Sequence, residues 1–359
     1  MGLETIELMT KVGQVLAIGP PRNCPKFPQK FYILVIFTSQ CFFALVSIVK
    51  NDFFQQDNVI KMTIAYIIEI LLAGFGFYVG IVLNFARRRQ WFELLEGFST
   101  VEGPKSLAKF YCLNFLYFVL TTVYVYLWFG YAQWDFFVRY GFREVQLYYQ
   151  FFYKLFLIEL IGLFLAEYRN VSLVLIKFLK HRRRLQNITS KVPLRLVRQT
   201  TKIILRLKNS GMIFNHLFGW PVAIILAFTT LQLLNLTLYS FSNVRVTTID
   251  SVVFFLIKIT TTFIWTSEFI LLCHRVTEEG KKITELIYDV RKHIAKSRPE
   301  ERKELYELTE TIAENLPEFS AAGFFAIKKS NFLRMLETTA NFLIVVLQFS
   351  IAYKKKQEK

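Results

Sequence analysis

Strongly apolar runs alternate with basic stretches along this chain of 359 residues. A helix that crosses the hydrocarbon layer of a bilayer needs about 20 consecutive, mostly apolar residues. Seven segments meet this requirement, and they are Phe31–Val49, Ile60–Phe85, Phe110–Tyr131, Tyr148–Ile176, Phe214–Tyr239, Val252–Cys273 and Phe332–Ala352. The pattern predicts an all-α polytopic membrane protein with seven transmembrane helices. Pro221 should kink the fifth helix.

Two segments between these helices are too long to be simple turns. Residues 177–211 are strongly basic, and their apolar positions allow either a solvated linker or an amphipathic helix after Pro193. Glu279–Ser330 has clearer helical periodicity, broken at Pro299, and its apolar positions are Ile283, Leu286, Ile287, Val290, Ile294, Leu305, Leu308, Ile312 and Leu316. A solvated hairpin is one reading. We favour the other, in which the sixth helix continues beyond the bilayer into a packed intracellular domain that buries these faces.

Composition and charge agree with a membrane protein. Hydrophobic residues make up 53% of the chain, and Lys and Arg outnumber Asp and Glu by 44 to 27. The basic residues lie between the apolar runs, so they report topology, and we expect no nucleic-acid partner. With the N-terminus inside, residues 1–30, 86–109, 177–211 and 274–330 hold 31 Lys and Arg residues, against nine in the outer loops and C-terminal tail. The positive-inside rule therefore predicts a cytoplasmic N-terminus and an extracellular C-terminus.

The last apolar segment carries a short motif. It reads Asn341-Phe342, then the five hydrophobic residues 343–347, then Gln348-Phe349. Gustatory receptors of insects have Thr-Tyr, five hydrophobic residues and Gln-Phe in their seventh helix, so the chain resembles this family. Asn341-Phe342 departs from Thr-Tyr but keeps a polar residue followed by an aromatic one. Residues 323–328 also resemble the stretch that leads into that helix in the family.

The resemblance implies a tetrameric, ligand-gated cation channel in the plasma membrane, opened by a small-molecule tastant. The assembly would be a homotetramer or a heterotetramer with related receptors, in contact with membrane lipid, and no cofactor is implied. The implied organisation has four parts. Residues 1–30 are a cytoplasmic N-terminal segment, and residues 31–273 hold six transmembrane helices with a ligand pocket and basic cytoplasmic loops. Residues 274–330 form a cytoplasmic anchor, and residues 331–359 form a pore-lining seventh helix with a short extracellular tail.

Polar positions on the seventh helix are the candidates for the pore. Arg334, Thr338, Asn341, Val345 and Gln348 recur at spacings of four and three, which places them in one stripe on an otherwise largely apolar helix. Gln348 would line the pore and Val345 would form part of the gate, and we assign Asn341 and Ile344 to the same region. The alternative is that Asn341 and Gln348 form hydrogen bonds between helices.

Aromatic residues and intramembrane charges are the candidates for the ligand pocket, and the set is Tyr124, Tyr126, Phe156, Trp265 and Glu69. Together the aromatic residues suggest a pocket for a small apolar or amphipathic ligand. Each of them also has an ordinary interpretation as core or interface packing. Glu69 and Lys258 should face the interior of the bundle, where an interior salt bridge is the alternative to ligand contact.

Other functional classes find little support in the sequence. The four histidines are scattered, and no cysteine spacing, catalytic triad or glycine-rich phosphate motif appears, so we expect no enzyme. A secondary transporter is a weaker alternative, because the chain has one proline-kinked helix and no internal repeat. An odorant receptor of the same superfamily is a closer alternative, although the Gln348-Phe349 ending favours the gustatory branch.

Overall fold

The computed structural model describes residues 2–21, 27–50, 59–98, 107–132, 135–184, 191–242, 253, 256–292 and 299–357. The helices are α1 (Gly2–Val15), α2 (Phe27–Lys50), α3 (Val59–Phe77), α4 (Arg88–Glu96), α5 (Leu107–Ala132), α6 (Asp135–Arg184), α7 (Lys191–Ser242), α9 (Trp265–Lys292), α10 (Pro299–Glu314) and α11 (Lys329–Gln357). Two π-helical stretches, η2 (Tyr78–Ala86) and η3 (Thr260–Ile264), join this series, as do the short strands β1 (Ser320–Ala321) and β2 (Phe325–Ala326).

The predicted apolar segments lie in helices throughout the described residues. Of the sixth segment, residues 252, 254 and 255 lie outside them. By length and composition, four described helical stretches are able to cross a membrane, and they are Met62–Ala86, Arg143–Lys180, Arg195–Thr237 and Leu256–Arg291. Phe110–Tyr126 is apolar but shorter. For α2, α5 and α11, crossing of the membrane stays a prediction of the sequence.

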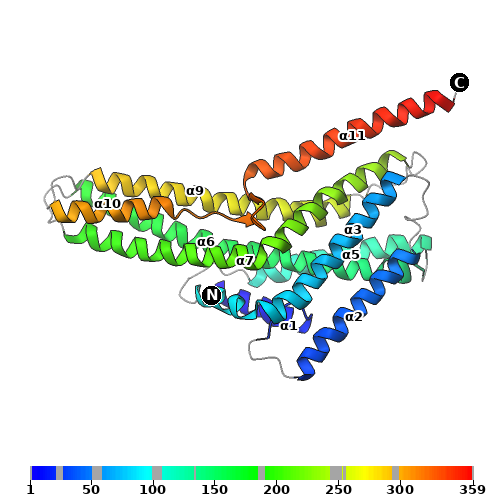
Figure 1. Ribbon diagram of the computed structural model, residues 1–359, viewed down its shortest axis with the longest axis horizontal. Helices are drawn as coiled ribbons and strands as arrows, with labels where there is room; N and C mark the ends of the chain where they lie inside the picture. The colour runs from blue at the N-terminus through cyan, green and yellow to red at the C-terminus, as the bar shows by residue number, and fades with distance from the viewer. Residues whose placement is uncertain are drawn as a thin grey trace.

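Two very long helices connect the two ends of the molecule. Helix α6 has 50 residues and α7 has 52. At about 1.5 Å per residue each is roughly 75 Å long, far more than a hydrocarbon layer of about 30 Å. Figure 1 shows α2, α3 and α5 beside one end of these helices and α9 and α10 beside the other, while α7 changes direction along its length. Pro221 lies inside α7, as the predicted kink requires.

The basic segment before the fifth apolar run is helical, as one of the two sequence interpretations proposed. Helix α7 begins at Lys191, and residues 185–190 lie outside the described part of the chain. Val197, Ile204 and Leu207 are buried, so this part of α7 has an internal apolar face. Val197 packs with Leu179 of α6 and Val290 of α9.

The periodicity of Glu279–Ser330 also produces packed helices. Ile283 and Ile287 of α9 are fully buried, and so is Ile312 of α10. Helices α9 and α10 pack against each other and against α7, and α9 also packs along α6. The apolar faces of this segment are therefore packed and not solvated, while the intracellular placement of the domain stays a prediction. Ile294 and the side chains of Leu305 and Leu308 lie outside the described residues.

A group of interlocking rings fills the region where α4, α6, α7 and the β-hairpin meet. We call it the aromatic cluster, and its members are Trp91, Phe98, Phe156, Phe164, Phe214, Phe218 and Phe319. Trp91 stacks on Phe156 with ring centroids 4.8 Å apart, and Phe98 meets Phe164 edge-on at 4.7 Å. Every ring is at most 3% exposed. The cluster fixes α4 and the hairpin to the two long helices.

Three small elements do not follow from the sequence pattern. Helix α1 buries Ile6 and Met9 against the bundle, where it contacts α5 and α6. The chain after it is held by Tyr153, whose hydroxyl donates to the carbonyl oxygen of Ile18. The other two elements are α4 and the antiparallel β-hairpin of β1 and β2. The hairpin adds four strand residues to an otherwise helical fold and turns through Gly323, which has a φ of 78°.

Candidate functional site

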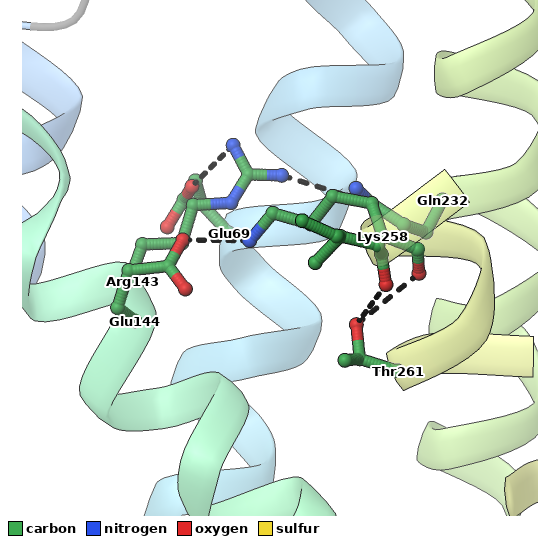
Figure 2. A network of polar contacts seen from close by, with 7 residues as sticks. Glu69, Arg143, Glu144, Gln232, Lys258 and Thr261 are labelled. Carbon is green, nitrogen blue, oxygen red and sulfur yellow. Dashed lines mark hydrogen bonds and ion pairs between the residues drawn. The ribbon is translucent and has the colours of Figure 1, made fainter. Parts of the chain in front are cut away.

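Charged side chains from separate helices meet inside the bundle (Figure 2). Arg143 of α6 lies with its Nη1 3.7 Å from Oε1 of Glu69 on α3, and its Nη2 donates to Oε1 of Gln232 on α7 at 3.2 Å. Nζ of Lys258 donates to Oε1 of Glu144 at 2.8 Å. Each pairing offsets part of the cost of removing these charges from water. For Glu69 and Lys258, the structure thus shows the interior salt bridge that the sequence left open.

A small pocket opens beside these pairs, and we call it the polar pocket. Its lining residues are Tyr117, Thr121, Tyr124, Glu144, Leu147, Gln150, Lys154, Phe228, Ile257, Lys258, Thr261 and Thr262. The ring of Tyr124 faces Nζ of Lys258 at 3.9 Å from its centroid, which is a cation–π contact. The cavity volume is about 20 Å³. That is room for a single water molecule, so a larger ligand would have to displace side chains.

A distortion of the helical stretch Leu256–Arg291 shapes one wall of the polar pocket. The π-helical turn η3 runs from Thr260 to Ile264. Within it, the carbonyl oxygen of Thr262 accepts from Nζ of Lys154 at 3.0 Å and from Oγ1 of Thr266 at 2.9 Å. A π-turn changes the usual helical hydrogen bonding, and such turns occur frequently at functional sites. In this turn the carbonyl oxygen of Thr262 accepts a hydrogen bond from Lys154 of α6.

The amide of Gln150 lies in the same wall of the polar pocket. Gln150 is fully buried, and neither its Nε2 nor its Oε1 has a hydrogen-bond partner in the described part of the chain. It precedes Lys154 by four residues on α6, so the two side chains lie on one face of that helix. Lys154 is 3% exposed. The polar pocket therefore has an amide and an ammonium group next to each other.

The structure does not bring together the five residues that the sequence suggested for a ligand pocket. Tyr124 lines the polar pocket, and Glu69 belongs to the adjoining ion pair. Phe156 is in the aromatic cluster, and Trp265 meets the ring of Phe151 edge-on at 5.9 Å. Tyr126 is 77% exposed. Most of these aromatic side chains thus pack against neighbours or face outward.

Sequence reasoning passed over four residues of this region, and they are Arg143, Glu144, Gln150 and Lys154. The charge count assigned Arg143 to an outer loop, whereas it lies within α6. The available signal was the spacing of Gln150 and Lys154 inside an apolar run, because polar groups at membrane depth face the protein interior. Among the described residues, no group of three or more His, Cys, Asp or Glu side chains is placed to hold a metal ion.

Helix α11 presents the predicted polar stripe on its open side. Arg334, Thr338, Asn341, Val345 and Gln348 are all exposed, as is Ile344. Phe342, next to Asn341 in sequence, is partly buried and packs against the cluster of Ile64, Ile68, Leu72 and Phe228. Within the described chain α11 contacts mainly α7 and α9, and Figure 1 shows most of its length apart from the other helices. The stripe therefore faces away from its own chain.

The comparisons with known proteins agree with this architecture. The model of the 7tm Chemosensory receptor family matches residues 8–353, so the chain belongs to that family. The family is one of receptors, which confirms the expectation that the chain is not an enzyme. Among curated proteins the search finds no match.

Two similar solved structures are of the insect olfactory receptor OR5 from Machilis hrabei. The one in complex with eugenol has a TM-score of 0.67 at 11% identity, and the comparison covers 96% of this chain and 98% of that one. The second has a TM-score of 0.63 at 10% identity, with the same coverage. This likeness in fold confirms the predicted class, an all-α polytopic membrane protein.

Proposed function

We propose that this protein is a gustatory receptor subunit, a ligand-gated, non-selective cation channel of the plasma membrane that a small-molecule tastant opens. Membership of the chemosensory receptor family supports the sensory role. The Gln348-Phe349 ending of α11 supports the gustatory branch. The observation that carries the channel is the exposed stripe on α11, in which Arg334, Thr338, Asn341 and Gln348 are polar and Val345 is apolar.

The stripe needs a polar environment. An amide such as that of Asn341 or Gln348 is costly in lipid unless it faces water or another polar group. A tetramer of this chain, or of this chain with related receptors, would turn four copies of α11 toward one axis. Gln348 would then offer amide oxygens to hydrated cations, and Val345 and Ile344 would form an apolar constriction that closes by dewetting.

The proposed orientation has the N-terminus in the cytoplasm and the C-terminus outside. Figure 1 supports it, because the C-terminal end of α11 lies at the end of the molecule away from α9 and α10, and the N-terminus lies between the two ends. The cluster Arg87, Arg88 and Arg89 follows η2 on the side assigned to the cytoplasm. The packed domain of α9 and α10 is then the proposed cytoplasmic anchor.

The ligand would bind at the polar pocket, near Tyr124 and the ion pair of Glu69. Helices α5, α6 and α7 all contribute to its lining, so a ligand that entered would separate them. Phe263, in the same π-turn as Thr262, stacks on Phe332 of α11 with centroids 5.4 Å apart. A movement of η3 would therefore be transmitted to α11 directly through the contact of Phe263 with Phe332, which would couple ligand binding to the pore.

An odorant receptor is the second candidate. One similar solved structure is that of an insect olfactory receptor in complex with eugenol. The likeness is at 11% identity and concerns the fold alone, so it gives less weight to this candidate than the motif of α11 gives to taste.

Current recording in heterologous cells that express the full chain tests the proposal. We expect some tastants to evoke saturable currents carried by Na⁺ and K⁺. An N-terminal tag should stain after permeabilisation only, and a C-terminal tag in intact cells. Saturable uptake of a ligand without any current would indicate a transporter, and the reverse staining would contradict the proposed orientation.

A further inference from the structure

The charges around the polar pocket do not balance within the described residues. Arg143 pairs with Glu69, and Lys258 pairs with Glu144. Lys154 is a third cation, 3% exposed, and it forms no ion pair with a described carboxylate. Among the described residues, its hydrogen bond runs to the carbonyl oxygen of Thr262. An ammonium group has three donors, so two of them lack a described protein acceptor.

Gln150 lacks partners in the same place. Its Nε2 donor and Oε1 acceptor are both buried and unpaired in the described part of the chain. Leaving a buried polar group unsatisfied costs about 1–3 kcal/mol, and more for a charged group. The donors of these two groups lie one helical turn apart and line one cavity, so a single acceptor that enters the polar pocket would serve both.

We propose that the polar pocket binds the carboxylate of a small organic acid, which pairs with the ammonium of Lys154 and accepts a hydrogen bond from Nε2 of Gln150. A carboxylate supplies the missing negative charge and has two acceptor oxygens for the two donors. The rest of the ligand lies against the apolar part of the lining, which is Leu147, Phe228 and Ile257. This inference rests on the proposed function, since it names the chemical class of the ligand that opens the channel.

The test uses matched ligands on the purified full-length receptor. Sodium hexanoate and sodium benzoate are each compared with the primary amide and the methyl ester of the same carbon skeleton, by ligand-induced shifts of Tm and by evoked current. We expect the carboxylates to raise Tm in a saturable way, with little effect of the amides and esters. Binding by neither carboxylate, or tighter binding of the neutral compounds, would overturn the proposal.

Two substitutions of opposite expected sign separate a ligand contact from a structural role. Lys154→Gln should weaken carboxylate binding by about 10- to 100-fold, as expected for hydrogen bonds to a charged group. Glu144→Gln leaves Lys258 uncompensated, so it should strengthen carboxylate binding. A merely structural role of Lys154 predicts weaker binding in both variants. Lys202→Gln, a matched change at an exposed lysine of α7, should leave binding unchanged.

The outcomes also distinguish this inference from the proposed function. Carboxylates that bind without evoking any current would leave the binding site for a carboxylate standing and show that these acids do not open the channel. Currents evoked by the amides, with equal potency in wild type and Lys154→Gln, would keep the channel and remove the inference. Chloride is the other source of a small anion. If replacing chloride by methanesulfonate lowers Tm only when Lys154 is present, and carboxylates add nothing, an inorganic anion occupies the site and the organic-acid proposal fails.

Discussion

In the aromatic cluster every ring meets another ring, whereas in the polar pocket Gln150 meets no hydrogen-bond partner among the described residues. The two regions share α6 and α7. Phe214 and Phe164 sit in the first, where ring packs against ring, and its one unsatisfied polar atom among the described residues is Nε1 of Trp91. Lys154 and Glu144 line the second, around a cavity of about 20 Å³. Glu144 pairs there with Lys258, whereas Lys154 has no ion-pair partner among the described residues.

The difference indicates that one part of α6 and α7 is rigid and another part of the same two helices is easier to rearrange. Close packing resists deformation, because a small change in volume is felt by every neighbour. Unsatisfied polar groups beside a cavity have the opposite effect, since another arrangement or a bound partner can satisfy them better. The aromatic cluster is therefore the rigid part of the bundle, and the polar pocket is the part that we propose a ligand changes.

Phe214→Ala should give the largest loss of stability. Phe214 is fully buried, with its ring centroid 5.2 Å from those of Phe218 and Phe319. Removal of such a ring costs about 3–5 kcal/mol through lost burial and the remaining cavity. Tm of the purified receptor measures the effect, with Phe115→Ala as control because Phe115 is 70% exposed on α5. Equal losses in the two variants would contradict the role of the cluster as the rigid part of the bundle.

Arg143→Met should destabilise the polar region by about 3 kcal/mol, because it leaves the carboxylate of Glu69 buried without its cation. This is the lower end of the usual range, since the Arg143 side chain keeps 12% exposure. The double variant Glu69→Leu with Arg143→Met should recover most of the loss, because two apolar side chains need no partner. Thermal unfolding of all three proteins measures the coupling. Purely additive losses would show that the pair is not a unit.

Gly219→Ala should cost about 1–3 kcal/mol through overpacking. A Cβ atom at Gly219 of α7 would lie 2.8 Å from the backbone nitrogen of Ala322 in the β-hairpin. The backbone is the obstacle, so α7 and the hairpin would have to separate. Gly211→Ala is the matched control, since its Cβ atom would meet open space. Protease sensitivity of the hairpin should increase in the first variant only, and an intact hairpin in both would refute the close approach.

Gln150→Leu should have the smallest effect on stability, within about 1 kcal/mol and toward stabilisation, because the amide has no hydrogen bond to lose. Gln232→Leu is the comparison, since Oε1 of Gln232 accepts from Arg143 and its loss should destabilise. Denaturant titration of both variants in detergent gives the two values. A large loss for Gln150→Leu would mean that its amide is satisfied, and the contrast between the two regions would weaken.

Much of the fold follows from the sequence because apolar length and helical period dictate it. The burial of Ile283 and Ile287 was predictable from spacing alone. Helices α1 and α4 were not, because they are short, and the direction in which they pack depends on partners distant in the chain, such as Phe156 for Trp91. Local pattern does not encode such contacts.

The candidate site was predictable only in part. The cost of a charge in a membrane predicted that Glu69 and Lys258 face inward, and it named a salt bridge as one outcome. The sequence did not identify the ion-pair partner of Glu69, because the approach of Arg143 to Glu69 depends on how α3 and α6 cross. Aromatic abundance suggested a pocket of rings, but rings such as Phe156 pack best with each other. The lining of the polar pocket emerges only from tertiary structure.

The ion selectivity of Gln348→Arg tests most directly whether α11 lines a cation pore, as we propose. Four arginines at one level of the pore would repel cations, so evoked cation current should fall sharply or lose its selectivity, whereas Gln348→Asn should conduct like the wild type. Phe342→Leu, on the face of α11 that packs within its own chain, should leave selectivity unchanged. Unaltered conductance and reversal potential in Gln348→Arg would show that Gln348 does not line the pore.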